Sequence, residues 1–117
     1  MNGVYEDMET VRADLLVHAG TSMRYGIQTL VQSETGGEYM PLDMSQWTGQ
    51  FVLATEDGAI LWQRALWFSK DGWAVIDINK NVFNDGTLSY TGGLWRMKAT
   101  APDNHVERLG EGYWTLS

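Results

Sequence analysis

The chain contains no cysteine, and only two of its 117 residues are proline. The lack of cysteine excludes disulfides, thiolate metal sites and cysteine nucleophiles, so the fold must depend on packing. Basic residues are also few, with eight Lys and Arg against fifteen Asp and Glu, for a formal net charge of −7. They form no run along the sequence, so we expect no nucleic-acid-binding surface.

Long apolar runs are absent as well. No stretch approaches the roughly 20 apolar residues that a membrane-spanning helix needs, and residues 1–14 are acidic and lack the apolar segment of a signal peptide. We therefore expect a soluble protein that is not secreted by itself and makes no membrane contact. Its mass of 13.2 kDa is that of one domain.

What the chain does have is a regular series of turns. Asp-Gly dipeptides occur at Asp57-Gly58, Asp71-Gly72 and Asp85-Gly86, each fourteen residues after the last. Asp-Gly suits tight hairpins because Gly takes positive φ at no steric cost and Asp bonds its own backbone. The segments between them are rich in Val, Ile, Leu, Trp and Phe, which indicates a β-meander.

Alternation of apolar and polar residues predicts strands. From Met23 to Gln32 every second residue is apolar or Thr, and only Leu30 breaks the pattern. Pro41 cannot donate to a ladder and should lie at a strand end or an edge. The other expected strands are 15–19, 47–55, 60–68, 73–79 and 94–100, with a last pair at 106–109 and 113–116.

Strands of this number and length predict an all-β fold: a single antiparallel β-sandwich of immunoglobulin-like build over residues 14–117. Helix should be nearly absent, with one turn at most around 79–84. Residues 1–13 form an N-terminal arm in which Tyr5, Met8 and Val11 have helical spacing. The arm is either a partly ordered terminus or a clasp onto a neighbouring subunit.

The order of these elements resembles the small β-sandwich proteins of tailed-phage virions, in particular minor tail and baseplate proteins of actinobacterial and lactococcal phages. The resemblance covers the chain from Asp14 onward, and its central part, 58–77, aligns only loosely. The matching pieces are Asp14-Leu15, Gly20-Thr21, Leu42-Asp43, Trp47-Thr48-Gly49, Gly72 to Asn79, Trp95, Pro102-Asp103-Asn104, Val106, Arg108-Leu109 and the Gly-Glu-Gly of 110–112.

The resemblance implies a structural component of a virion, in the tail or its tip, assembled in the host cytoplasm. Its partners would be copies of itself, as a trimer or hexamer, and other virion proteins. The alternatives are a carbohydrate-binding module for host attachment and a capsid decoration protein. Fold does not fix function, so these alternatives stay open.

Six tryptophans are more than one small sandwich core holds comfortably, so we expect three or four in the core and one or two at the surface. Surface tryptophans would form a subunit interface or a sugar-stacking platform, for which Trp62, Gln63 and Arg64 are the one suggestive segment. The tryptophans are Trp47, Trp62, Trp67, Trp73, Trp95 and Trp114. The predicted contact residues are Tyr5, Met8, Trp62, Trp67 and Trp114.

Catalytic, cofactor and metal sites are not expected. Residues 77–81 begin like a calcium-binding loop, but Val82 replaces the required Gly and Leu88 the closing Glu. Neither His18 nor His105 is in a setting typical of a catalytic triad, and no Gly-rich loop opens a helix. The many carboxylates are better explained as a solvated surface than as a glycosidase pair. The sequence thus predicts a protein that is not an enzyme.

Overall fold

The computed structural model describes residues 10–32, 37–83 and 89–117, and within these ranges no residue is helical. The prediction of an all-β fold is confirmed. The described strands are β1 (Val11–Arg12), β2 (Leu15–Val17), β3 (Met23–Gln28), β4 (Leu30–Gln32), β5 (Tyr39–Pro41), β6 (Thr48–Ala54), β7 (Ile60–Ala65), β8 (Trp67–Phe68), β9 (Trp73–Ile78), β10 (Gly92–Thr100) and β11 (Val106–Leu116).

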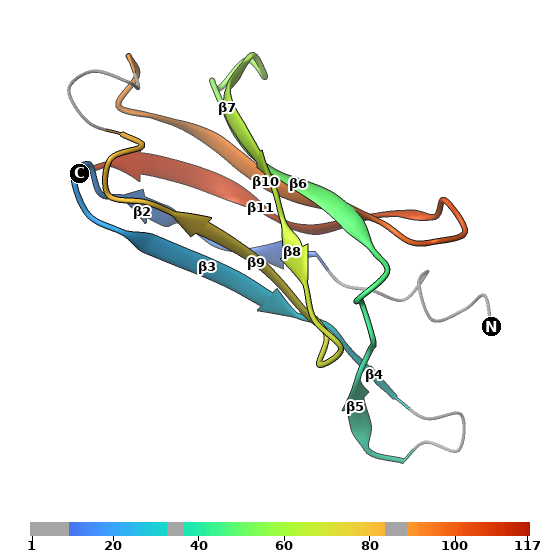
Figure 1. The fold of residues 1–117 in the computed structure, drawn as a ribbon. Coiled ribbons are helices and arrows are strands. Elements are labelled where there is room, and N and C mark those ends of the chain that lie inside the picture. Colours follow the sequence, from blue (N-terminus) through green and yellow to red (C-terminus); the bar gives the residue numbers. More distant parts are fainter. Residues whose placement is uncertain (1–9, 33–36, 84–88) are drawn as a thin grey trace.

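Two sheets face each other as layers of a β-sandwich, and a hairpin projects from one end (Figure 1). The six-stranded sheet has the order β1-β11-β10-β6-β7, and β2 also pairs with β11. The three-stranded sheet has the order β3-β9-β8, and β4 pairs with β5 alone. All pairings are antiparallel except those of β1 and β2 with β11. The immunoglobulin-like build stays a prediction.

The core lies between the two layers and is dominated by large side chains. Alternate residues of β10 face it, as the period-two rule for strands requires. The same alternation along β3, half-buried against exposed, confirms the predicted pattern there. The most deeply buried large side chains are Trp114, Phe51, Met44, Leu53, Ile76, Ile78 and Met97.

Strands β10 and β11 are joined by two reciprocal pairs, in which a Trp of one strand lies opposite a Gly of the other. In the ladder, Gly93 is opposite Trp114 and Trp95 is opposite Gly112. Each indole crosses the glycine and donates a hydrogen bond to the next strand segment: Trp114 Nε1 to Ala54 O at 3.0 Å, and Trp95 Nε1 to Ala13 O at 2.8 Å. A Cβ at Gly93 would lie 2.0 Å from Ala54 O, and one at Gly112 would lie 1.9 Å from Ala13 O. Only glycine lets the indoles pass.

Two of the Asp-Gly turns are where the sequence placed them. Gly58 lies between β6 and β7 and Gly72 between β8 and β9, both at positive φ. Asp57 accepts a hydrogen bond from the Thr55 hydroxyl, which in turn accepts from the Ala59 amide. The third dipeptide, Asp85-Gly86, is outside the described residues.

Three element boundaries differ from the prediction. The two strands expected at 106–109 and 113–116 are one: β11 runs through the Gly-Glu-Gly of 110–112, with a shift of register opposite Met97 and Lys98. The strand expected at 60–68 splits at Leu66, where the chain passes from the six-stranded sheet to the three-stranded one. Val11 and Arg12, assigned to the arm, pair with β11 as strand β1. Residues 80–83 form a turn without a helical segment.

Candidate functional site

The predicted contact residues differ in how exposed their side chains are. Trp67 is 50% exposed on β8, as expected for a contact residue. Trp62 is half-buried: its ring contacts Phe51 and Phe83, and the Arg64 guanidinium lies over it. Tyr5 and Met8 are outside the described residues.

The prediction that Trp114 is a surface contact is wrong. Its side chain is 1% exposed because even-numbered residues of β11 from 110 onward face the core, and its indole is held by Ala54. The expected division of the tryptophans holds, since three are buried (Trp47, Trp95 and Trp114) and two are exposed (Trp67 and Trp73).

A hollow of about 740 Å³ lies at the edge of the six-stranded sheet, over β1, β10 and β11. We call it the basic hollow, because three arginines line it. Its lining residues are Arg12, Ala13, Asp14, Leu94, Trp95, Arg96, Arg108, Glu111, Gly112 and Tyr113.

Strand register gathers these arginines from distant parts of the sequence. Arg12 is opposite Glu111 in the β1–β11 ladder, and Glu111 is opposite Arg96 in the β10–β11 ladder. Lys98, opposite Arg108, extends the basic surface along β10. Half of the chain's eight basic residues therefore lie on one face of a protein with a net charge of −7.

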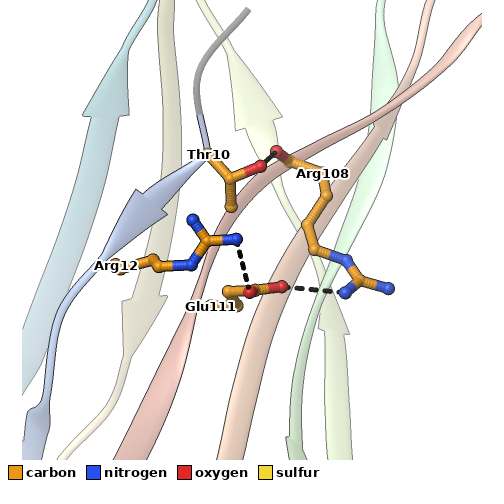
Figure 2. Close-up of polar contacts among 4 residues, drawn as sticks. All are labelled: Thr10, Arg12, Arg108 and Glu111. Atoms are coloured by element: carbon orange, nitrogen blue, oxygen red, sulfur yellow. Dashed lines mark hydrogen bonds and ion pairs between the residues drawn. The ribbon is translucent and has the colours of Figure 1, made fainter.

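Glu111 holds two of the guanidiniums in place (Figure 2). Its Oε1 accepts from Arg108 Nη1 at 2.8 Å, and its Oε2 lies 3.3 Å from Arg12 Nη2. The hydrogen bond and charge of Arg108, with that of Arg12, lower the pKa of the Glu111 carboxyl below its ordinary value. Next to them, Thr10 donates its hydroxyl proton to Arg108 O at 3.0 Å. Glu111 thus stays charged and keeps both arginines together.

The hollow has spare capacity to bind an anion. A guanidinium carries five N–H donors, and the ion pairs with Glu111 use one each on Arg12 and Arg108. Among the described residues, Arg96 takes part in no ion pair. Tyr113, which is exposed, adds an aromatic ring at the far end. Arginine forks with an adjacent ring suit carboxylates or phosphates.

Sequence reasoning missed this site because the basic residues are scattered along the chain. One signal was present: Arg96 and Lys98 are two apart on a strand and therefore share a face. The contribution of Arg12 and Arg108 depends on which strands pair and in which register, and a single sequence does not state this.

The hairpin β4–β5 offers a second, apolar surface. It stands away from both layers in Figure 1, and of its strand residues only Val31 is half-buried, the others being exposed. Tyr39 is 65% and Met40 61% exposed. Its base is fixed, since the Thr29 amide donates to Gly72 O at 2.8 Å and the Leu42 amide to Thr29 O at 3.0 Å.

The segment that began like a calcium loop is occupied by internal contacts. Asp77 pairs with Arg24, and Asn79 Oδ1 accepts from the Asn81 amide. Over residues 10–32, 37–83 and 89–117, no group of three or more His, Asp and Glu is placed to hold a metal ion. The same residues include no helix that could cross a membrane.

Each of the two histidines contacts the side chain of another residue. His18 Nδ1 lies 2.8 Å from Ser117 Oγ, which joins the end of β2 to the end of β11. His105 Nε2 lies 2.7 Å from Glu107 Oε1 beside the β10–β11 turn.

Comparison with protein-family models finds no match to this chain, and a search of curated proteins finds none either.

Proposed function

We propose that this chain is a structural component of a tailed-phage virion, in the tail or its tip, that acts by protein–protein assembly. The observation that carries the proposal is the projecting hairpin β4–β5. An isolated two-stranded hairpin is only marginally stable in water, and this one exposes Leu30, Tyr39 and Met40. A partner that covers these side chains would stabilise the hairpin while burying apolar surface.

Two further features support assembly. Trp73 and Trp67 share the outer face of the three-stranded sheet, because Val75 is opposite Trp67 and two residues from Trp73. Gly72, which anchors the hairpin base, immediately precedes Trp73. The hairpin base is therefore next to Trp73 along the chain, and we take the exposed hairpin side chains with Trp67 and Trp73 as the proposed contact region. Strand β3 is an edge of its sheet, and an edge can accept a strand from a neighbour.

The resemblance noted from the sequence points this assembly module toward phage particles. Mass spectrometry of purified particles from the phage or prophage that encodes the chain tests this placement. We expect the chain among the particle proteins, at the tail by immunogold labelling. Its absence from washed, intact particles would contradict the proposal.

The contact region is tested with Tyr39→Ser/Met40→Ser in the full chain. We expect light scattering to show a lower mass than wild type across a wide concentration range, or loss of binding to particles assembled without the chain. Ile60→Ser is the matched control: Ile60 is 52% exposed but lies by the β6–β7 turn. If both variants lower association equally, the hairpin has no specific role.

A second candidate function is glycan binding, now at Trp67 and Trp73 instead of Trp62. Their face also carries Gln28 and the Arg24–Asp77 pair. The pKa of Asp77 is lowered chiefly by its hydrogen bond with Arg24, and to a lesser degree by the Trp67 side chain. Exposed tryptophans beside planar polar groups can bind sugars by stacking and hydrogen bonds. Quenching of tryptophan fluorescence by host-surface polysaccharide, lost in Trp73→Ala, would favour this function.

A further inference from the structure

We propose that the basic hollow binds the acidic N-terminal segment, residues 1–9, of a second copy of this chain. This inference rests on the proposed assembly function and specifies one of its contacts. It assigns an acceptor (Arg12, Arg96 and Arg108) and a donor segment that the same sequence supplies.

The charge of the hollow fits this occupant. Three arginines line it against two carboxylates, Asp14 and Glu111, so its lining is net positive in a chain of net charge −7. One of those carboxylates is already shared between Arg12 and Arg108. Arg96, with no ion pair among the described residues, is the guanidinium with most donors to offer.

The segment complements the hollow in composition. Residues 1–9 include Glu6, Asp7 and Glu9 and no Lys or Arg. Carboxylates match the planar fork of arginine, which binds them through two parallel hydrogen bonds. Tyr5 and Met8 lie among these acids in the sequence, and the exposed ring of Tyr113 provides an apolar surface for them.

The direction of β1 favours a second copy over the segment's own chain. Strand β1 runs parallel to β11, and Thr10 bonds to Arg108 O, so the chain joins the sheet at the Arg108 end of the hollow. From there β1 continues alongside the hollow toward Asp14, while the hollow extends to Tyr113. A segment of the same chain would have to reverse direction at Thr10 to enter it.

A segment from one copy and a hollow on the next form a heterologous contact, which builds rings when the rotation closes. Such a ring would be compatible with the trimer or hexamer that the sequence resemblance implies. It is also sensitive to salt, because the paired groups are exposed: the side chain of Arg12 is 72% and that of Arg108 48% exposed.

Three full-length variants test the inference by sedimentation equilibrium. The hollow variant is Arg96→Glu, the segment variant is Glu6→Lys/Asp7→Lys/Glu9→Lys, and the control is Lys80→Glu, which makes the same charge change at an exposed turn. Thermal melts confirm that each variant folds. We expect self-association to weaken about tenfold or more in the hollow and segment variants, as for loss of a hydrogen-bonded charge pair, and to be unchanged in the control.

Mixing the two defective variants gives the decisive result. The hollow variant keeps a normal segment and the segment variant keeps a normal hollow, so a one-to-one mixture should form heterodimers through that one intact contact, where neither variant associates alone. Failure of the mixture would overturn the inference. So would an effect of Arg96→Glu without any effect of the segment variant, since the hollow would then bind another anion.

The same measurements separate this inference from the proposed function. Association that survives both charge variants but is lost in Tyr39→Ser/Met40→Ser would overturn the inference and leave hairpin-mediated assembly standing. If association is unchanged in both charge variants, the segment does not bind the hollow of another copy, and any contact that it makes is within its own chain. A wild-type chain that stays monomeric at every concentration overturns the inference, while docking onto other virion proteins remains to be judged by particle composition.

Discussion

The indole of Trp114 passes directly over Gly93 to reach the carbonyl of Ala54 on the next strand, with an Nε1 to O distance of 3.0 Å. The contact spans three neighbouring strands of the six-stranded sheet, since Trp114 is on β11, Gly93 on β10 and Ala54 on β6. A buried side chain of β11 is therefore hydrogen-bonded to the backbone of β6, two strands away in the sheet.

Gly93→Ala should be strongly destabilising. The new Cβ would lie 2.0 Å from Ala54 O and 2.9 Å from Trp114 Nε1, so either the strand or the indole must move. We expect a loss of about 3 kcal/mol or more in the free energy of unfolding, at the high end for single substitutions. Urea denaturation followed by tryptophan fluorescence measures it.

Gly58→Ala is the matched control for that substitution. Gly58 has φ of 95°, but nothing lies within 4 Å of its Cβ position, so Ala there meets backbone strain without a clash. We expect about 1–2 kcal/mol, the cost of a left-handed residue. An equal loss at the two glycines would show that space over Gly93 is not limiting.

Trp114→Phe should cost about 1–3 kcal/mol, because it leaves part of the buried volume empty and removes the donor to Ala54 O. Trp73→Phe changes the same atoms on an exposed side chain and should stay within about 0.5 kcal/mol. The two variants are compared by the same denaturation curves. A Trp114 variant as stable as the Trp73 variant would contradict the assigned role of the indole.

Glu111→Gln should make acid unfolding less steep. The pKa of Glu111 is lowered in the folded chain, so its contribution to stability is present above the ordinary glutamate pKa, about 4.3, and is lost as the pH falls through the folded value. The variant lacks this loss, while Asp43, Asp57 and Asp77, whose pKa values are also lowered, retain theirs. Melting temperatures between pH 6 and pH 2 check the difference, and parallel curves would be the contrary result.

Amide hydrogen exchange should distinguish the hairpin from the sandwich. Amides of β4 and β5 that pair only with each other should exchange much faster than those of β10, which has strands on both sides. If the hairpin docks on a partner, its amides should become protected in the assembled state. Equal protection in the free and assembled states would argue against docking there.

The sequence predicted individual strands and turns better than it predicted which strands pair and in which register. The Asp-Gly turns and the alternation of β3 are local, so they were readable without a structure. Strands β10 and β11 each contain a Gly-x-Trp sequence, Gly93 to Trp95 and Gly112 to Trp114. Each Trp lies opposite the other strand's Gly only because the two strands pair antiparallel in this register. Without that register, the glycines at 110 and 112 were taken to separate two strands, and Trp114 was assigned to the surface.

The basic hollow was unpredictable for the same reason. Arg12, Arg96 and Arg108 are separated by up to 96 positions, and only the pairing of β1 and β10 with β11 brings them together. The projecting hairpin was readable in part, because Pro41 was expected at a strand end and Leu30 broke the alternation. Leu30 is now seen to be exposed on β4.

The parallel pairing of β2 with β11 has a consequence for biosynthesis. Leu15 is beside Trp114 and Val17 beside Leu116, and His18 contacts Ser117, so this border joins residues 99 positions apart. During translation the segment around Leu15 leaves the ribosome long before its neighbour exists, and it must wait without its hydrogen bonds until β11 emerges. Such distant contacts slow folding, so the nascent chain presents an open sheet border to chaperones until synthesis of β11 is complete.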